Sequence, residues 1–213
     1  MTQQSLALIF DFGNVVAYFD YKKACEQLGR ELGKTGEAFL EDIQAKGFSD
    51  LVKQYESGKI GSEDFSRETC NLAGLEVGHD IFATAWADIF WLNESVGRLI
   101  PYLKQQGYRL VLGSNTNDLH ALQFRRQFAE TLSSFDALVL SYEIGHLKPT
   151  AAFYEACVAA AGYPNESCVF IDDLEENVEG ARAAGLQGIV YRDYPALVEG
   201  LLSLGVSIPP QAH

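Results

Sequence analysis

The sequence has no surplus of basic residues. Sixteen Lys and Arg stand against 29 Asp and Glu in 213 residues, giving a formal net charge of −13. Such a surface repels phosphate backbones and anionic lipid, so we expect no nucleic-acid partner and no membrane partner. A small anionic substrate stays compatible with this charge if a metal ion, a lysine or helix N-termini supply positive charge locally.

Cysteine is scarce, and long apolar runs are absent. The four cysteines form no C-x-x-C pair and no cluster with histidine of zinc-binding spacing. The N-terminus lacks a basic segment followed by an apolar run and a cleavage site, and no stretch has the length of a bilayer span. These absences predict a cytoplasmic protein with reduced thiols.

Repeats, low-complexity tracts and Gly/Ser linkers are missing as well, and short apolar segments alternate with helical patterns instead. Strand-length segments lie at 6–10, 108–112, 137–140, 168–171 and 188–191. Helical spacing of apolar residues covers 94–106, 118–131, 150–161 and 174–184. This alternation predicts an α/β fold, a Rossmann-like parallel sheet core with helices on both faces.

Residues 17–93 interrupt the alternation and show no convincing strand. Their pattern predicts helices at 21–32, 34–45, 48–58, 62–73 and 79–90. A segment of this length is too large for a loop. We therefore expect residues 17–93 to form an inserted helical cap domain, and residues 1–16 with 94–213 to form the α/β core domain.

Polar side chains follow the predicted strands, at the edge where open parallel sheets bind ligands. The group comprises Asp11, Ser114, Asn115, Asp172, Asp173 and, from a loop, Lys148. Three carboxylates share a small space only with a cation or protons between them, and an oxygen-rich site suits Mg²⁺. Serine, asparagine and helix N–H groups suit phosphoryl oxygens. Simpler roles remain open: the paired aspartates can cap the following helix, and residues 114–116 can form an ordinary turn.

Four segments carrying these residues resemble, in order and spacing, the four motifs of the haloacid dehalogenase-like hydrolases. They are IFDFGNVV (9–16), LVLGSNTN (110–117), LKPTAAFY (147–154) and VFIDDLEENVEGA (169–181). The segment 17–93 corresponds to the helical cap of that superfamily. The first motif is similar to that of the bacterial α-D-glucose-1-phosphate phosphatase branch, and the N-terminal phosphatase domain of epoxide hydrolases is a further relative.

The resemblance implies a nucleophile and a metal site. Asp11 matches the nucleophile, which forms an aspartyl-phosphate and so divides a difficult displacement into two easier reactions. Asp172 and Asp173 match the acidic Mg²⁺ ligands, which Asp11 and the main-chain carbonyl of Gly13 complete. Asn177 matches a residue that supports the metal site.

It also implies a phosphate site. Ser114 matches the hydroxyl that binds the phosphoryl group, with Asn115 beside it. Lys148 matches the lysine that pairs with both nucleophile and phosphate. The implied enzyme is therefore a Mg²⁺-dependent phosphoric monoester phosphatase acting on a small phosphorylated metabolite, with a sugar phosphate such as glucose 1-phosphate favoured.

Gly13 departs from the commoner pattern, which has an aspartate here as general acid and base. General acid and base assistance raises the reaction rate by about 10²–10⁴-fold. Either another residue supplies this assistance, or the reaction depends on it less. A sugar 1-phosphate releases an anomeric hydroxyl, which is more acidic than an ordinary alcohol. His120 is near enough in sequence to be a substitute, and Tyr18 and Phe19 are expected to face the site.

Two other functions remain open at this stage. A haloacid dehalogenase-type hydrolase shares the scaffold and the nucleophile, but it needs no metal, so Asp172 and Asp173 speak against it. A catalytically weak binding or regulatory protein is compatible with Gly13. The substrate depends on the cap, and the sequence leaves both a monomer and a homodimer open.

Overall fold

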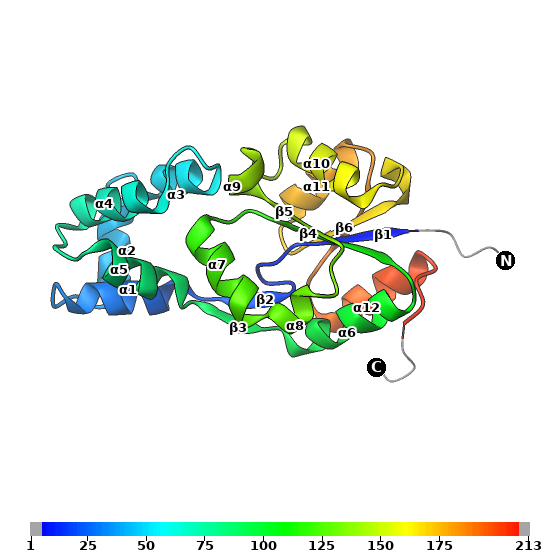
Figure 1. Cartoon of the computed structure of the whole chain (residues 1–213), viewed down its shortest axis with the longest axis horizontal. Coiled ribbons are helices and arrows are strands. Elements are labelled where there is room, and N and C mark those ends of the chain that lie inside the picture. Colours follow the sequence, from blue (N-terminus) through cyan, green and yellow to red (C-terminus); the bar gives the residue numbers. More distant parts are fainter. Residues whose placement is uncertain (1–5, 209–213) are drawn as a thin grey trace.

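A five-stranded parallel sheet forms the centre of the computed structural model, which describes residues 6–208 (Figure 1). The strands are β1 (Ala7–Phe10), β4 (Arg109–Ser114), β5 (Ala137–Leu140), β6 (Cys168–Asp172) and β7 (Gln187–Val190), in the spatial order β5-β4-β1-β6-β7. The chain starts at the central strand and adds strands first on one side and then on the other. Residues 1–5 and 209–213 of the predicted core domain lie outside the described residues.

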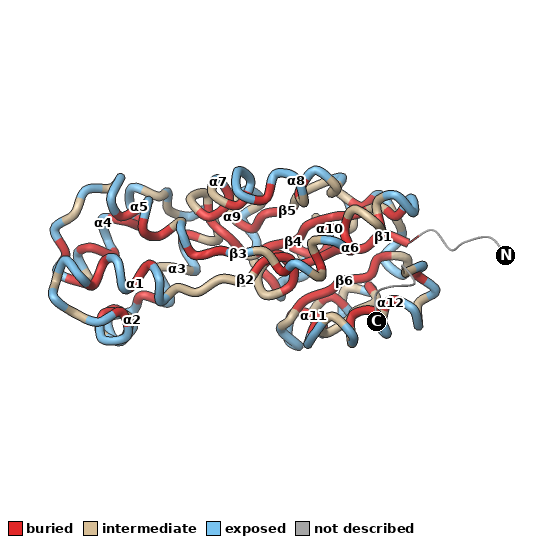
Figure 2. Tube along the Cα trace, turned by 90° about the horizontal axis from the view of Figure 1, so that it is seen from below, coloured by how far each residue is buried: buried red, intermediate tan, exposed pale blue. Residues whose placement is uncertain are grey.

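Helices cover both faces of this sheet, as predicted. One face carries α10 (Ala151–Ala161) and α11 (Glu175–Ala183); the other carries α6 (Glu94–Gln105) and α12 (Tyr194–Ser203). Alternate residues of β1 divide between the faces, because side chains on a strand point in opposite directions in turn. Ile9 packs with the α10 side and Leu8 with the α6 side, both without exposed surface. Figure 2 shows these inner strands as buried and the outer helix faces as exposed.

The helices expected between the first two core strands lie together at one end of the molecule (Figure 1). They are α1 (Tyr21–Arg30), α2 (Gly36–Gln44), α3 (Phe48–Glu56), α4 (Ser62–Ala73) and α5 (His79–Ala87). The Thr35 hydroxyl accepts a hydrogen bond from the Ala38 N–H and so caps α2. Aromatic rings form the centre of this group, including Phe65, which stacks on Tyr55 with centroids 4.3 Å apart.

The expectation that residues 17–93 contain no strand was wrong. β2 (Ala17–Phe19) and β3 (Phe90–Leu92) pair as an antiparallel ribbon at the two ends of the helical insertion. Each strand has only three residues, so neither shows an alternating pattern that sequence analysis detects. The predicted helix 118–131 also divides into α7 (Asp118–Gln127) and α8 (Ala129–Leu132), because the backbone leaves the helical conformation at Phe128.

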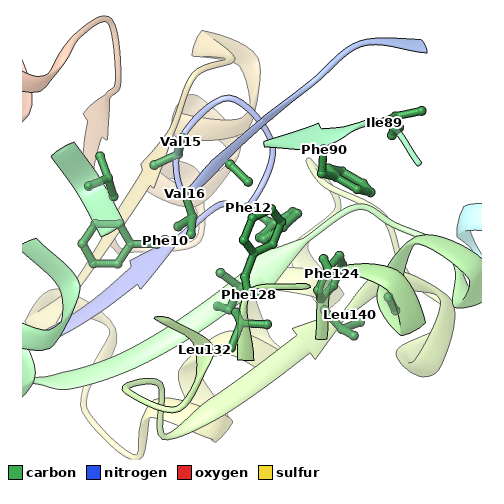
Figure 3. Packing of buried hydrophobic residues seen from close by; sticks show 14 of the residues in the cluster. Phe10, Phe12, Val15, Val16, Ile89, Phe90, Phe124, Phe128, Leu132 and Leu140 are labelled. Carbon is green, nitrogen blue, oxygen red and sulfur yellow. The ribbon is translucent and has the colours of Figure 1, made fainter. Parts of the chain in front are cut away.

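Phe12 connects the ribbon to the core. Its ring lies 5.5 Å from that of Phe90 in β3 and 4.2 Å from that of Phe124 in α7. Figure 3 shows these rings gathered beside the end of β1. The turn that follows the first core strand is therefore held by packing from both sides. Two short elements, α9 (Ser141–Ile144) and η1 (Asn165–Ser167), complete the secondary structure of residues 6–208. Within that range no helix has both the length and the apolar character that crossing a bilayer requires.

Candidate active site

Three carboxylates meet at the carboxyl edge of the sheet. Asp11 follows β1 directly, Asp172 ends β6, and Asp173 is the next residue. Because β1 and β6 pair in parallel with Phe10 opposite Ile171, their carboxyl ends coincide, and the Asp11 N–H donates to the Ile171 carbonyl at 2.8 Å. Oxygen atoms of the three carboxylates lie within 4.8 Å of one another. This is a group that could hold a hard metal ion.

Lys148 supplies the positive charge beside them. Its Nζ lies 2.7 Å from Oδ1 of Asp11 and 2.7 Å from Oδ2 of Asp172. The lysine side chain is only 2% exposed, so water screens these pairs little. Burial lowers the pKa of Lys148, but the charges of Asp11 and Asp172 outweigh it and hold the pKa above its usual value. The ammonium is therefore charged at neutral pH.

The two neighbouring aspartates of β6 have different surroundings. Asp172 accepts from Lys148 on Oδ2, and from the Leu174 N–H and the Asn177 amide on Oδ1, both at 2.9 Å. These bonds connect the end of β6 to Leu174, which precedes α11 (Glu175–Ala183), and to Asn177 in its first turn. Asp172 does not line the cavity described below. Asp173 does line that cavity. The predicted role of Asn177 in supporting this region has a structural counterpart in its bond to Asp172.

The turn after β1 aims Asn14 at Asp173. Asn14 has a φ of 56°, in the left-handed region that asparagine tolerates better than most residues. Its Nδ2 donates to Oδ2 of Asp173 at 3.0 Å. Burial raises the pKa of Asp173 and the charge of Asp172 adds to it, while the Asn14 hydrogen bond and Lys148 act in the opposite direction. A first-motif residue thus orients the carboxylate of the last motif.

Ser114 and Asn115, at the end of β4, have different contacts. Both line the cavity. The Asn115 side chain accepts from the Lys148 N–H at 2.8 Å and donates to the Lys148 carbonyl at 3.3 Å. The amide of Asn115 therefore holds the loop that carries the lysine. The Ser114 hydroxyl makes one long bond, 3.3 Å, to the Asn115 carbonyl, so it can turn toward a ligand.

A cavity of about 340 Å³ opens over this edge. On the sheet side it is lined by Asp11, Gly13, Asn14, Ser114, Lys148 and Asp173. On the side of the helical insertion it is lined by Phe19, Tyr21, Glu56 and Phe90. The volume suits a small metabolite. Phe19 faces the site as expected, whereas Tyr18 is not among the lining residues and lies beside Trp91 instead, with ring centroids 6.0 Å apart.

Tyr21, Glu56 and Phe90 were not identified from the sequence. Tyr21 begins α1, Glu56 ends α3 and Phe90 begins β3. No spacing connects them, because they reach one cavity only through the docking of the helices on the sheet edge. The sole available signal for Glu56 was an acidic residue at the end of a helix in the insertion, which is common on any surface.

His120 lines the cavity, but both of its ring nitrogens already have partners. Nδ1 lies 2.9 Å from the Asn117 amide nitrogen, and Nε2 lies 3.0 Å from the Trp86 carbonyl. The ring therefore accepts at Nδ1 and donates at Nε2. Burial lowers the pKa of His120 to about 4, so the imidazole is neutral at pH 7. The structure favours a packing role over the acid/base role considered above.

Asp11 is held near its point of ionisation. Burial, the largest influence, and the charges of Asp172 and Asp173 raise the pKa of its carboxyl, Lys148 lowers it, and together they bring the pKa to about 7. Oδ1 of Asp11 also accepts from the Phe12 N–H at 2.7 Å. The other oxygen is left for the cavity. The positive charge of one lysine does not neutralise three carboxylates, so a bound cation would offset the remaining negative charge.

The haloacid dehalogenase-like hydrolase family model matches residues 6–185. The chain belongs to this family and is a hydrolase. The resemblance read from the four motifs is thereby confirmed, as are the Rossmann-like α/β fold and the expectation of an enzyme.

Relatives of known activity are distant but nearly full-length. A D-ribitol-5-phosphate phosphatase of Bacteroides thetaiotaomicron is 24% identical over 84% of this chain and 88% of its own length. A phosphorylated carbohydrates phosphatase of Thermotoga maritima is 22% identical over 91% and 90%. A solved HAD family enzyme of B. thetaiotaomicron, in complex with magnesium and inorganic phosphate, superposes with a TM-score of 0.76 at 23% identity, covering 91% of this chain and 98% of its own.

Proposed function

We propose that this protein is a Mg²⁺-dependent phosphatase of small phosphorylated metabolites, with sugar phosphates favoured. One observation carries the proposal: Asp11, Asp172 and Asp173 lie within 4.8 Å of one another beside the buried Lys148, and all of these except Asp172 line a metabolite-sized cavity. The names of the two phosphatase relatives support a phosphorylated polyol or carbohydrate as the substrate class.

The donor set fits Mg²⁺. Carboxylate and carbonyl oxygens are the ligands this ion prefers, and it commonly takes one or two carboxylates together with substrate phosphate oxygens. Asp11, Asp173 and the Gly13 carbonyl would hold it, while Asp172 would add negative charge nearby and keep Lys148 in place. When bound, the ion would neutralise phosphate charge that builds up in the transition state.

The side chains then have distinct roles in phosphoryl transfer. The free Asp11 oxygen attacks phosphorus and forms an aspartyl-phosphate, and water then hydrolyses that acyl phosphate. Lys148 holds the phosphoryl oxygens and the nucleophile together, and the Ser114 hydroxyl donates to another phosphoryl oxygen. Asn115 acts through the Lys148 loop that it fixes. Positioning and charge neutralisation are the main requirements of this reaction.

The division of labour between two domains is part of the proposal. Residues 1–16 and 94–213 would supply the phosphoryl chemistry, and the cap, residues 17–93, would supply the wall that selects the rest of the substrate. Phe19 and Tyr21 contribute aromatic side chains to that wall, and Glu56 contributes a carboxylate. An aromatic face and a carboxylate are groups that suit a polyhydroxylated ligand. We favour glucose 1-phosphate because its anomeric oxygen leaves more readily than a primary alkoxide.

A halide-releasing hydrolase is the second candidate, since it would use the same nucleophile. A screen of sugar phosphates with Mg²⁺ separates the two. We expect phosphate release that EDTA abolishes and that Asp11→Asn abolishes, with glucose 1-phosphate turned over faster than glucose 6-phosphate. Halide release from 2-haloacids that survives EDTA would favour the second candidate. Absence of any turnover would leave a binding or regulatory protein.

A further inference from the structure

The space beside Gly13 is already filled. A Cβ built on Gly13 would lie 2.8 Å from Cε1 of Phe19, closer than real Cβ atoms approach another heavy atom. Phe19 in turn packs against Tyr21, with ring centroids 5.3 Å apart, and against Phe90 at 6.3 Å. The aromatic wall of the cavity thus takes the place of an acid at position 13. Any group that exchanges protons with the leaving oxygen must come from elsewhere.

Most other titratable groups of the cavity wall are committed. Lys148 is shared between Asp11 and Asp172. His120 uses both ring nitrogens. Burial raises the pKa of the Tyr21 phenol well above its usual range, and the charge of Glu56 adds to the shift. Asp173 is bound by Asn14 and belongs to the candidate metal site. Glu56 remains.

Glu56 lies at the end of α3, on the cavity wall that belongs to the helical insertion. Among residues 6–208 its carboxylate has no hydrogen bond and no ion pair, although the charge of Lys148 across the cavity acts on it. This position costs free energy in the absence of a ligand, because a partly buried carboxylate without a partner loses part of its hydration. The arrangement favours a partner that enters with the substrate.

The backbone of Glu56 is fixed to the sheet edge. The Ser141 hydroxyl lies 2.6 Å from the Glu56 carbonyl and also accepts from the Thr116 N–H at 2.9 Å. Thr116 follows Ser114 and Asn115, so a single hydroxyl joins the end of α3 to the proposed phosphate-binding turn. The neighbouring Tyr55 hydroxyl is bonded to Asp118 at the start of α7. The glutamate is thus held at a defined place over the site.

We propose that Glu56 is the general acid and base of this enzyme, protonating the leaving oxygen of the substrate and then activating water. The proposal rests on the phosphatase function given above. It also assigns a catalytic role to the helical insertion, which contributes a reacting group in addition to the substrate-selecting wall.

The two half-reactions balance. In the first, an Asp11 oxygen bonds to phosphorus, the P–O ester bond breaks, and the departing oxygen keeps the electron pair and takes the proton of the Glu56 carboxyl. In the second, a water oxygen bonds to phosphorus, the Glu56 carboxylate takes one of its protons, and the Asp11–phosphorus bond breaks. The products are alcohol and inorganic phosphate, with Asp11 ionised and Glu56 protonated again.

The surroundings of Glu56 suit this use. Burial raises the pKa of its carboxyl to about 7, and Lys148 acts in the opposite direction. The other titratable groups that line the cavity are Lys148, Tyr21, His120 and the carboxylates of Asp11 and Asp173. A pKa close to the working pH lets one group donate and accept protons in turn. An exposed glutamate would be ionised at neutral pH and would be a poor donor.

Glu56→Gln tests the role, with Glu41→Gln, on the exposed face of α2, as the matched control. Phenyl phosphate and p-nitrophenyl phosphate are similar in size, but p-nitrophenolate leaves without a proton at neutral pH. We expect Glu56→Gln to lower kcat/KM for phenyl phosphate and glucose 6-phosphate by about 10²–10⁴-fold, and for p-nitrophenyl phosphate by less than about tenfold. Because water activation is also lost, p-nitrophenol should appear in a burst of one equivalent per enzyme, followed by slow turnover.

Three results would overturn the role of Glu56 while leaving the phosphatase intact. The first is an equal loss of kcat/KM for phenyl phosphate and p-nitrophenyl phosphate in Glu56→Gln. The second is no loss of kcat/KM for either ester, and the third is the absence of a p-nitrophenol burst. Thermal unfolding of the variant, and Glu56→Asp as a carboxylate with shorter reach, test for misfolding: a folded Glu56→Asp should be intermediate on phenyl phosphate. Absence of hydrolysis of every ester by the unmodified protein with Mg²⁺ would overturn the phosphatase function itself, and the role of Glu56 with it.

Discussion

The Nζ of Lys148 lies 2.7 Å from a carboxylate oxygen of Asp172, and the two side chains are only 2% and 0% exposed. The same ammonium lies 2.7 Å from Asp11. Asp172 therefore holds the ammonium of Lys148 in place, and the same ammonium contacts the proposed nucleophile, Asp11. The Lys148 ammonium is therefore held in position before the substrate arrives, and little reorganisation of this charge is needed during the reaction.

Replacing the lysine should affect activity and stability separately. Lys148→Met leaves two buried carboxylates without their partner, a change that typically costs about 3–5 kcal/mol. We expect a loss of unfolding free energy of that order without Mg²⁺, a smaller loss with Mg²⁺, and kcat/KM lowered by about 10²–10³-fold. Urea unfolding with and without Mg²⁺ measures the first effect. Lys23→Met, on the exposed side of α1, should change neither quantity appreciably.

Asp173→Asn should weaken metal binding more than folding. Asp173 lines the cavity, and Asn14 is its sole hydrogen-bond partner through a side chain within residues 6–208. We expect a higher Mg²⁺ concentration for half-maximal activity, by about 10–100-fold, with little change in unfolding free energy without metal. Mg²⁺ titration of the phosphatase rate measures this. Glu175→Gln, an exposed residue of α11, is the control. Unchanged Mg²⁺ dependence in Asp173→Asn would remove this residue from the metal site.

The contact between Gly13 and Phe19 predicts energetic coupling. Gly13→Ala places a methyl group against the Phe19 ring, and overpacking of this kind costs about 1–3 kcal/mol. In a Phe19→Ala background the same substitution should cost much less, because the opposing ring is gone. A double-mutant cycle on unfolding free energy measures the coupling. If the changes in unfolding free energy from the two substitutions were additive, the Phe19 ring would move aside for the methyl group without strain.

His120 should make folding sensitive to mild acid. Its pKa is 6.5 when free and about 4 in the folded chain. As pH falls below 6.5 the unfolded chain takes up a proton that the folded chain refuses until about pH 4, so the stability due to the neutral ring is complete above pH 6.5 and is lost as pH falls to 4. At about 1.4 kcal/mol per pH unit, the stability advantage over His120→Gln should shrink by about 2 kcal/mol between pH 7.5 and 5. An advantage that stays constant with pH would contradict a buried neutral imidazole.

The strands of the sheet core could be predicted from sequence because their signals are local. Apolar runs such as 168–171 end in a polar residue, and parallel pairing then brings the ends of β1, β4 and β6 to one edge. That is why Asp11, Ser114 and Asp173 could be placed together without coordinates. Lys148 joined them only through its motif, since a lysine in a loop is usually solvated.

The helical side of the site could not be predicted in the same way. The strands β2 and β3 are too short for a pattern, and the direction of Glu56 depends on how α3 docks against Ser141. Phe19 was expected near the site, but its contact with Gly13 follows from packing that spacing does not encode. Asn115 was predicted to bind phosphate, and it does line the cavity; the hydrogen bonds of its amide to the backbone of Lys148, 33 positions away, were not predicted.

Identification of the phosphorylated residue tests the central claim most directly. The protein is mixed with glucose 1-phosphate and Mg²⁺, quenched with acid within the first turnover, digested and examined by mass spectrometry. We predict one added phosphoryl group on the peptide that contains Asp11, and none in Asp11→Asn. Phosphate release at an undiminished rate with no phosphoryl group on that peptide, or with the group on another residue, would contradict Asp11 as the nucleophile.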